Sequence, residues 1–323
     1  MAFAGAFLIA AGMGIGCFAY TPLLPGLQEA LSWSVAQAGD VASANYLGYL
    51  LGAMLASQLV HRPQRASALL MGMFFSGLST LVCMWISSYE SWLAMRFLSG
   101  FASAFCFILG TAIVVEEFKR CGKPYLISTH FAGLSIGIIG SVVIIEIAKH
   151  YAYPVSMQWG VLGVCGFVML GLSAVVFNSI PTLAENLQSS PAEQPEQSSS
   201  ALLRRLIIAY GLFGFGYVVT ATFIIAIARQ FENAVFLEPA TWIIVGLVGA
   251  PSIYFWQLIS RLFGVFVALR FAYTIEAIGV LLAGSANSPI AVACGGAMLG
   301  GTFMAITAMG IVAAREVSGA SYD

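Results

Sequence analysis

One arginine of this sequence lies inside a long apolar segment, where a charged side chain is costly. Arg96 begins the stretch RFLSGFASA, about five residues into the apolar run 91–115. Burying an arginine at the middle of a membrane costs at least ~2.5–3.5 kcal/mol, so such residues usually serve a function. The alternative is that the side chain extends to the outer headgroups, because the end of the run is only about 7 Å away. We favour a functional role for Arg96.

Five further polar side chains lie inside apolar runs, namely Tyr20, Asn45, Tyr49, His130 and Tyr217. Asn45 and Tyr49 are four residues apart, so they share one helix face. Each of the five could instead hydrogen-bond to a neighbouring helix. A single histidine such as His130 is more often structural, although it can titrate near neutral pH. We predict that these five residues and Arg96 line a substrate and coupling cavity.

Two carboxylates lie close to the ends of apolar runs. Glu146 is near the outer end of the run 124–148, and Glu276 is a short way into the run 264–284. A side chain near such an end can extend its charged group to the membrane surface. We therefore expect both carboxylates to be solvated.

The stretch GLSIG at 133–137 matches the G-x-S-x-G pattern of serine hydrolases. That pattern works at a turn between a strand and a helix, which a continuous apolar run does not provide. An intramembrane serine hydrolase could place Ser135 on a helix, but it needs a histidine on a facing helix. His61 and His150 lie in expected loops, and His130 shares the helix of Ser135.

Other kinds of chemistry lack a sequence signal. Five of the six cysteines lie in apolar runs and no two have metal-ligand spacing, which indicates small packing residues. The chain also lacks a Walker motif and a basic stripe with interleaved aromatic residues. We expect no enzyme activity, no cofactor, no metal and no nucleic-acid partner.

The elements that position these residues are membrane-spanning helices. Hydrophobic residues make up 60% of the chain, charged residues 8%, and the mean hydropathy is +0.92, whereas a soluble domain carries roughly 25% charged residues. A spanning helix needs about 20 apolar residues. Ten runs qualify: 3–27, 40–60, 66–87, 91–115, 124–148, 157–177, 204–228, 240–260, 264–284 and 289–313. They do not alternate apolar with polar residues, which excludes barrel strands. The sequence predicts an all-α integral membrane protein surrounded by the lipid bilayer.

Basic residues predict the orientation of these helices. With the N-terminus in the cytoplasm, ten basic residues fall in cytoplasmic segments: Arg62, Arg65, Lys119, Arg120, Lys123, Arg204, Arg205, Arg261, Arg270 and Arg315. The outer loops hold two, Lys149 and Arg229. Cytoplasmic loops normally carry this excess of Lys and Arg.

The chain divides after its sixth predicted helix. Residues 182–200, TLAENLQSSPAEQPEQSSS, cannot bury apolar surface and are typical of a flexible linker. We expect a six-helix N-terminal half at 1–177, a cytoplasmic linker at 178–203, and an incomplete C-terminal half of four helices at 204–323.

The two halves repeat at an offset near 200 residues. Three sets of residues match in register: Gly14 and Gly16 with Gly214 and Gly216; Gln58, Leu59 and Arg62 with Gln257, Leu258 and Arg261; and Gly100, Gly110 and Glu116 with Gly300, Gly310 and Glu316. Small residues also recur every four positions at Ala44, Gly48, Gly52 and Ala56, at Gly12 and Gly16, at Gly133 and Gly137, and at Gly296 and Gly300. Parallel repeats build the two halves of many transporters, and the glycine faces predict close helix packing.

Three stretches carry a family resemblance: GIGCFAYTPLLP at 14–25, SANYLGYLLGAMLA at 43–56 and HFAGLSIGI at 130–138. Together they resemble the YbfB/YjiJ group of the major facilitator superfamily. The resemblance implies two six-helix halves around a central cavity, and the spacing of Arg96 and Gly100 is similar to the fourth-helix motif of that superfamily. Three features depart from the pattern. Cys17 stands where the group usually has arginine, the loop HRPQR at 61–65 lacks the full Asp-Arg-x-Gly-Arg motif, and the sequence stops before an eleventh helix.

The preferred interpretation is a secondary transporter in the inner (plasma) membrane. It would move a small-molecule substrate by alternating access, with a possible coupling proton and a lean towards export. Three alternatives stay open: a ten-helix transporter of the drug/metabolite type, an intramembrane hydrolase using Ser135, and an inactive truncated product.

Overall fold

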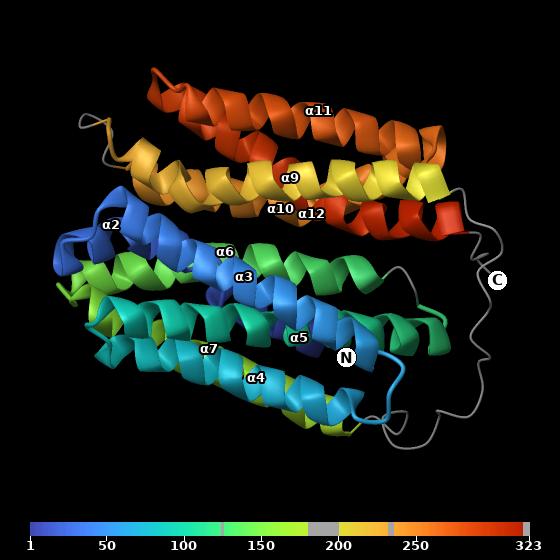
Figure 1. The fold of residues 1–323 in the computed structure, drawn as a ribbon, viewed down its shortest axis with the longest axis horizontal. Helices are drawn as coiled ribbons and strands as arrows, with labels where there is room; N and C mark the ends of the chain where they lie inside the picture. The colour runs from blue at the N-terminus through green and yellow to red at the C-terminus, as the bar shows by residue number, and fades with distance from the viewer. Residues whose placement is uncertain (124–125, 180–199, 232–235, 319–323) are drawn as a thin grey trace. The chain divides into compact units, whose positions relative to one another are not determined.

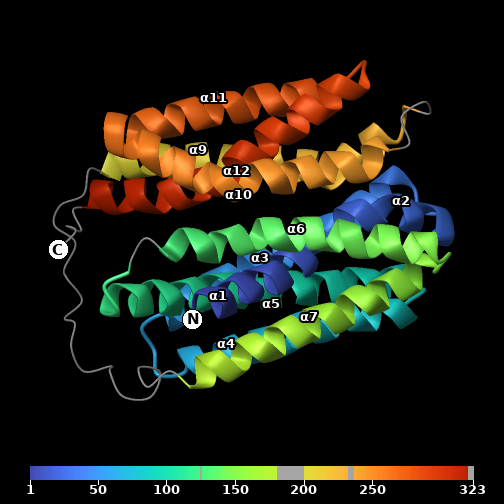
Figure 2. The same ribbon diagram turned by 180° about the vertical axis from the view of Figure 1, so that it is seen from behind.

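The computed structural model describes the chain except for residues 124–125, 180–199, 232–235 and 319–323. The described residues form helices and connecting turns and contain no strand. The chain separates into two compact units, Met1–Leu187 and Gln188–Asp323. Each unit is a bundle of helices that run back and forth (Figures 1 and 2). The predicted linker lies mostly outside the described residues.

The first unit contains the six predicted N-terminal spans. They are α1 (Ala2–Ile9), η1 (Ala10–Ile15) and α2 (Tyr20–Leu31), which together form one interrupted span; α3 (Val35–Leu59); α4 (Arg65–Val82) with the short η2 (Cys83–Trp85); α5 (Tyr89–Arg120); α6 (Ile127–His150); and α7 (Val155–Asn178). The second unit contains α9 (Ser200–Ala228), α10 (Leu237–Phe263), α11 (Val265–Gly284) and α12 (Pro289–Ser318).

The predicted all-helical membrane architecture is confirmed. Within the described residues, nine helices are long and apolar enough to cross a membrane. The remaining predicted span, 40–60, coincides with α3, which is 25 residues long. This helix is less apolar because Asn45, Tyr49 and several small residues occupy its length. The part of the chain that the structure describes therefore contains ten helices of spanning length.

Local sequence signals explain where several helices begin and end. Ser34 precedes α3 and forms a capping box, since its Oγ accepts from the Gln37 N–H and its own N–H donates to Gln37 Oε1. Such a cap satisfies donors that the first helical turn leaves free. At a helix C-terminus, α10 ends before Gly264, whose positive φ of 88° is a conformation that glycine adopts readily. Caps of this kind end the long helices sharply, so that short turns connect them.

The two units share one packing register. In the first, a Cβ atom added to Gly100 of α5 would overlap the carbonyl oxygen of Asn45 on α3. In the second, a Cβ added to Gly300 of α12 would overlap the carbonyl oxygen of Val245 on α10. Both residues of the second pair lie 200 positions after their counterparts. The predicted repeat is thus a repeat of helix contacts as well as of residues.

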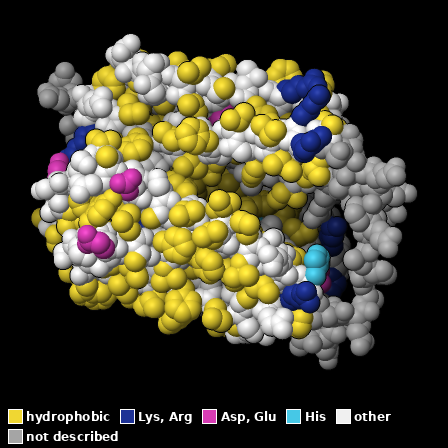
Figure 3. Space-filling model, in the orientation of Figure 1, with side chains coloured by type: hydrophobic (Ala, Val, Ile, Leu, Met, Phe, Trp, Pro, Cys, Tyr) yellow, Lys and Arg dark blue, Asp and Glu magenta, His cyan; other side chains and the backbone are white. Residues whose placement is uncertain are grey.

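Side chains are sorted by type along each bundle. Hydrophobic side chains cover the middle of the helices and most charged ones lie near helix ends (Figure 3). On α3 the exposed face carries Leu47, Leu50, Leu51, Met54 and Leu55. An exposed apolar face of this length is the surface that a bilayer requires.

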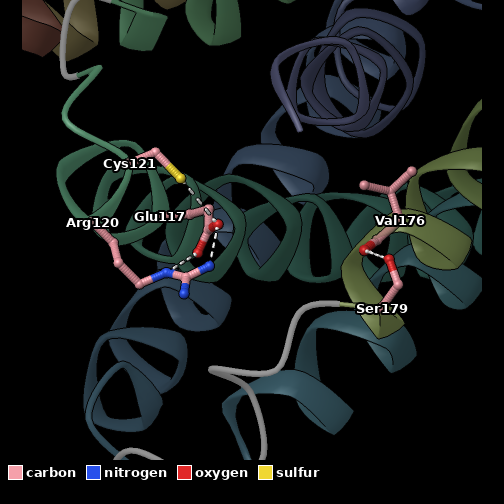
Figure 4. Close-up of polar contacts among 5 residues, drawn as sticks. All are labelled: Glu117, Arg120, Cys121, Val176 and Ser179. Atoms are coloured by element: carbon pink, nitrogen blue, oxygen red, sulfur yellow. Dashed lines mark hydrogen bonds and ion pairs between the residues drawn. The ribbon is translucent and has the colours of Figure 1, made fainter.

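The ends of α5 and α7 carry polar contacts of their own (Figure 4). Arg120 donates to Glu117 through Nε at 3.0 Å and Nη2 at 2.7 Å, and the Cys121 thiol lies 3.5 Å from the same carboxylate. Ser179 donates to the Val176 carbonyl at 2.8 Å. Successive helices run in opposite directions, so α3, α5 and α7 all end on the same side of the first unit. These contacts therefore mark that end, where the basic residues of the loops after α3 and α5 also lie.

Candidate functional site

The first span is broken near its middle. Residues Ala10–Ile15 form a π-helix, residues 16–19 form a turn, and regular helix resumes at Tyr20. The N–H groups of Gly16 and Phe18 bond to carbonyls five residues earlier, those of Ala11 and Met13. Three glycines between positions 12 and 16 permit this geometry, and Pro22 has no N–H to continue the regular pattern. Irregular turns of this kind often occur at functional sites.

Arg96 of α5 binds the backbone of this break. Its Nη1 donates to the Gly16 carbonyl at 2.8 Å and its Nη2 donates to the Cys17 carbonyl at 3.0 Å. One turn later, the Ser99 hydroxyl also donates to the Gly16 carbonyl at 2.8 Å. Arg96 is 1% exposed, so its side chain does not extend to the membrane surface. The alternative of a headgroup contact is wrong for this residue.

Aromatic rings, and not carboxylates, surround the guanidinium. Its Cζ lies 5.2 Å from the ring centroid of Tyr20 and 5.6 Å from that of Trp159, which is fully buried. The Tyr20 hydroxyl is held by the Ala38 carbonyl at 2.8 Å. No ion pair found among the described residues includes Arg96, and its Nε has no hydrogen-bond partner there. Carbonyl dipoles and π faces therefore hold this cation.

Asn45 belongs to the same cluster. Its Nδ2 donates to the carbonyl of Arg96 at 2.8 Å, which ties α3 to α5 at the level of the guanidinium. The structure thus brings Arg96, Tyr20 and Asn45 together, as the prediction of one site requires. Tyr49 lies one turn further along α3 and is half-buried, with its backbone beside Gly100.

Of the other two predicted cavity residues, His130 contacts a different part of the first unit and Tyr217 belongs to the second unit. His130 is fully buried, and its Nε2 is 3.0 Å from the Thr111 hydroxyl. Its Nδ1 packs against Gly5, where an added Cβ would come within 2.7 Å. His130 therefore joins α6 to α5 and α1. Tyr217 lies in the second unit, stacked on Phe213 with ring centroids 4.9 Å apart.

Glu146 behaves as the sequence predicts, whereas Glu276 does not. Glu146 is exposed and pairs with Lys149 at 2.8 Å. Glu276 is 4% exposed, and its Oε2 is hydrogen-bonded to the Thr302 hydroxyl of α12. The expectation that Glu276 is solvated is therefore wrong. Its position as the twelfth of the twenty residues of α11 is a sequence signal that could have identified it, since a side chain at mid-helix cannot reach either surface easily.

Most of the predicted packing glycines lie at helix contacts. Added Cβ atoms would meet a neighbouring helix at Gly14, Gly16, Gly48, Gly52, Gly100, Gly133, Gly137 and Gly300. For example, a Cβ on Gly14 would lie 2.6 Å from the Cα of Gly137, so the broken span packs directly on α6. Gly214 and Gly216 have nothing within 4 Å of an added Cβ. Within the described helices of the second unit these two glycines make no close helix contact, so packing at both positions stays a prediction.

Comparisons with known proteins agree with this architecture. A family model described as "Uncharacterised MFS-type transporter YbfB" matches residues 9–322. The uncharacterized MFS-type transporter YceJ of Bacillus subtilis is 25% identical over 262 residues, covering 80% of this chain and 66% of that protein. The 4-hydroxybenzoate transporter PcaK of Pseudomonas aeruginosa is 26% identical over 182 residues, covering 56% of this chain and 40% of that protein. The chain thus spans about two thirds or less of the length of these relatives.

Solved structures show the same fold at low identity. The nucleoside transporter NupG superposes with a TM-score of 0.70 at 12% identity, covering 98% of this chain and 86% of that one. The xylose transporter XylE from E. coli, in a partially occluded inward-open conformation, superposes with a TM-score of 0.67 at 13% identity, covering 98% and 83%. At this identity the likeness concerns the fold alone.

Proposed function

The chain belongs to the YbfB group of MFS-type transporters, and from this premise we propose that it moves a small solute across a membrane by secondary transport. Membership of this family makes it part of a transporter and not of an enzyme. The match over residues 9–322 does not favour the ten-helix drug/metabolite architecture or a hydrolase based on Ser135.

One observation carries the proposal: a cation buried on the broken backbone of a spanning helix. A buried charge without a charged partner is costly, and the contacts of the Arg96 guanidinium found among the described residues are with carbonyls and aromatic rings. A purely structural contact could be made by an uncharged side chain at lower cost. The guanidinium is therefore best explained as a group that changes partners, leaving the carbonyls of Gly16 and Cys17 when a substrate or another conformation supplies better ones.

This chemistry suits a small planar organic anion as the substrate. A guanidinium binds a carboxylate through two parallel hydrogen bonds, and the rings of Tyr20 and Trp159 would contact a flat molecule. The similarity to a transporter named for 4-hydroxybenzoate agrees with this substrate class. Asn45, which is bonded to the Arg96 carbonyl, would keep the arginine in place.

We also propose a location and a driving force. The excess of basic residues in the loops after α3 and α5 supports a cytoplasmic position for that end and for the N-terminus, and hence insertion in the inner (plasma) membrane. A proton gradient is the proposed energy source, since no nucleotide-binding motif occurs in the sequence.

An uptake experiment with the 323-residue chain in proteoliposomes tests the proposal. The panel is 4-hydroxybenzoate, uridine and xylose, each measured with a pH gradient of either sign. We expect uptake of 4-hydroxybenzoate above that of protein-free liposomes, with loss of uptake in Arg96→Ala. Arg120→Ala is the matched control, because this arginine is exposed at the end of α5 and its loss should leave uptake unchanged. Equal uptake by wild type and Arg96→Ala would refute the proposed role of the arginine.

A further inference from the structure

Glu276 places a carboxyl group in the interior of the second unit. It lies near the middle of α11 and is 4% exposed. Helices α11 and α12 pack closely from its level towards the C-terminal end of α11. An added Cβ on Gly279 would come within 2.7 Å of the Met298 Cβ, and one on Gly295 within 2.9 Å of the Ala283 Cβ. The carboxyl group therefore lies in a tight helix interface.

The hydrogen bonds around Thr302 indicate which atoms carry protons. The Thr302 hydroxyl lies 2.6 Å from the Met298 carbonyl oxygen and also contacts Glu276 Oε2. A hydroxyl has one proton, and a carbonyl oxygen can only accept. If the hydroxyl donates to Met298, its contact with Glu276 needs a proton on Oε2. If it donates to Glu276 instead, two bare oxygens face each other at 2.6 Å. The first arrangement satisfies both contacts.

Among the described side chains of the second unit, no cation is placed to compensate an ionised Glu276. The other carboxyl oxygen, Oε1, has no hydrogen-bond partner among the described residues. The charged side chains of the helices packed on α11 lie near helix ends: Arg204, Arg205 and Arg229 for α9, Glu238 and Arg261 for α10, and Glu316 for α12. On α11 itself Arg270 is exposed. An ionised carboxylate would be buried without a partner, which is strongly unfavourable.

The remaining titratable side chains of α9 and α11 are tyrosines. Tyr210 and Tyr217 belong to α9, and Tyr273 lies one turn before Glu276 on the same face of α11. The Tyr273 hydroxyl is buried and has no hydrogen-bond partner in the described part of the chain. Tyrosine is neutral near pH 7, so none of the three supplies a positive charge. Glu276 Oε1 and the Tyr273 hydroxyl are thus two buried polar groups that lack a hydrogen-bond partner among the described residues, on side chains about one helical turn apart.

Comparison of the two repeats indicates that helix packing alone does not require a carboxyl group at position 276. In the offset of 200, its counterpart is Ser76, which is also buried and whose hydroxyl also has no partner among the described residues. Conversely, the counterpart of Arg96 is Gly296. At each of these two repeat positions, one unit carries a buried ionisable group where the other has a small residue. A site that packs well with serine does not need a carboxyl group.

We propose that Glu276 is a proton-binding site, which holds a proton as a neutral carboxylic acid in this conformation and releases it when α11 and α12 expose it to water. Only the O–H bond of the carboxyl group breaks, and water accepts the proton. Thr302 is the positioning residue that accepts the carboxyl hydrogen bond. The inference rests on the proposed proton-driven transport for its purpose, but the protonation of Glu276 can be measured without any transport.

Infrared spectroscopy of the purified 323-residue protein provides that measurement. At neutral pH we expect a C=O stretching band of a protonated carboxylic acid, which disappears in Glu276→Gln. Glu146→Gln is the matched control, because that carboxylate is exposed and paired with Lys149, so the band should remain. Thr302→Val should shift the band to higher frequency through loss of the hydrogen-bond acceptor, and Thr302→Ser should leave it in place.

Two results would overturn the inference: absence of the band in the wild-type protein at neutral pH, or its persistence in Glu276→Gln. If Glu276→Gln does not fold, the comparison of Thr302→Val with Thr302→Ser decides, since an unchanged band in both variants excludes Glu276 as its source. With a transported solute in hand, Glu276→Gln should still exchange solute across the membrane but lose its response to a pH gradient. Gradient-driven transport without the infrared band would leave the proposed function standing and reject only this site.

Discussion

Replacing Arg96 by alanine should open the break in the first span. Arg96 donates two hydrogen bonds to backbone carbonyls at 16–17, and Ser99 donates one. In Arg96→Ala the Cys17 carbonyl loses its bond from Arg96, while the Gly16 carbonyl keeps its bond to Ser99. The segment at 16–19 should then separate from α5 more often, which exposes the Cys17 side chain.

The size of the effect follows from the contacts. Hydrogen bonds that involve a charged group contribute about 1.5–3 kcal/mol each, so two of them contribute about 3–6 kcal/mol. Removal of the buried charge offsets part of this loss, and we therefore take the lower end, about 3 kcal/mol. Since about 1.4 kcal/mol corresponds to a tenfold change in an equilibrium constant, the open population should rise about 100-fold.

Thiol labelling in detergent measures this population. Cys17 is 8% exposed, while Cys121, Cys165 and Cys294 are more accessible and are first replaced by serine. The labelling rate of Cys17 should rise about 100-fold in Arg96→Ala, in proportion to the open population. Cys106 at the centre of α5 is fully buried and serves as the internal reference.

Ser99→Ala is the control for this prediction. It removes one neutral hydrogen bond to the Gly16 carbonyl, which contributes about 0.5–1.5 kcal/mol, so labelling should rise about tenfold or less. An unchanged labelling rate in Arg96→Ala, or equal rates in the two variants, would refute the conclusion that the guanidinium holds the break closed.

Three further predictions concern packing, charge and orientation. Gly100→Ala and Gly300→Ala should each lower the melting temperature in detergent, because both place a Cβ on a facing backbone carbonyl. Gly214→Ala is the control and should leave the melting temperature unchanged, because an added Cβ there meets nothing within 4 Å. A lower melting temperature in only one of the two repeats would contradict the shared register. Lys149→Ala should change stability by less than about 1 kcal/mol in chemical denaturation, because the side chains of Lys149 and its partner Glu146 are 43% and 41% exposed; a larger loss would show that this ion pair is shielded from solvent. A membrane-impermeant maleimide should label Cys121 in inside-out vesicles and not in intact cells; the reverse would overturn the proposed orientation.

Long-range patterns in the sequence were sufficient for the helices and their repeat. Apolar runs of about 20 residues identify spans because backbone groups in lipid must bond within a helix. The offset of 200 between Gly100 and Gly300 also identified a true packing register, since in both units the glycine meets the carbonyl at the same relative position. Glycine is needed wherever two helix backbones approach this closely.

Contacts between distant residues could not be read in the same way. The sequence identified Arg96 as buried and important, but its partners are backbone carbonyls 79 and 80 residues away. Those carbonyls become accessible only because the first span unwinds, and the glycines and prolines there are equally compatible with a continuous kinked helix. Glu276 was placed near a surface because its distance from the helix start was underestimated, and Thr302 was not considered as its partner.

The most direct test of secondary transport is accumulation of a solute against its gradient without ATP. Proteoliposomes containing the 323-residue chain are given a pH gradient and the solute that the uptake panel identifies, at equal concentration inside and outside. We predict that the internal concentration rises above or falls below the external one, according to the sign of the pH gradient, and returns to equality when nigericin dissipates that gradient. A distribution that stays equal under either sign of the gradient would contradict secondary transport by this protein.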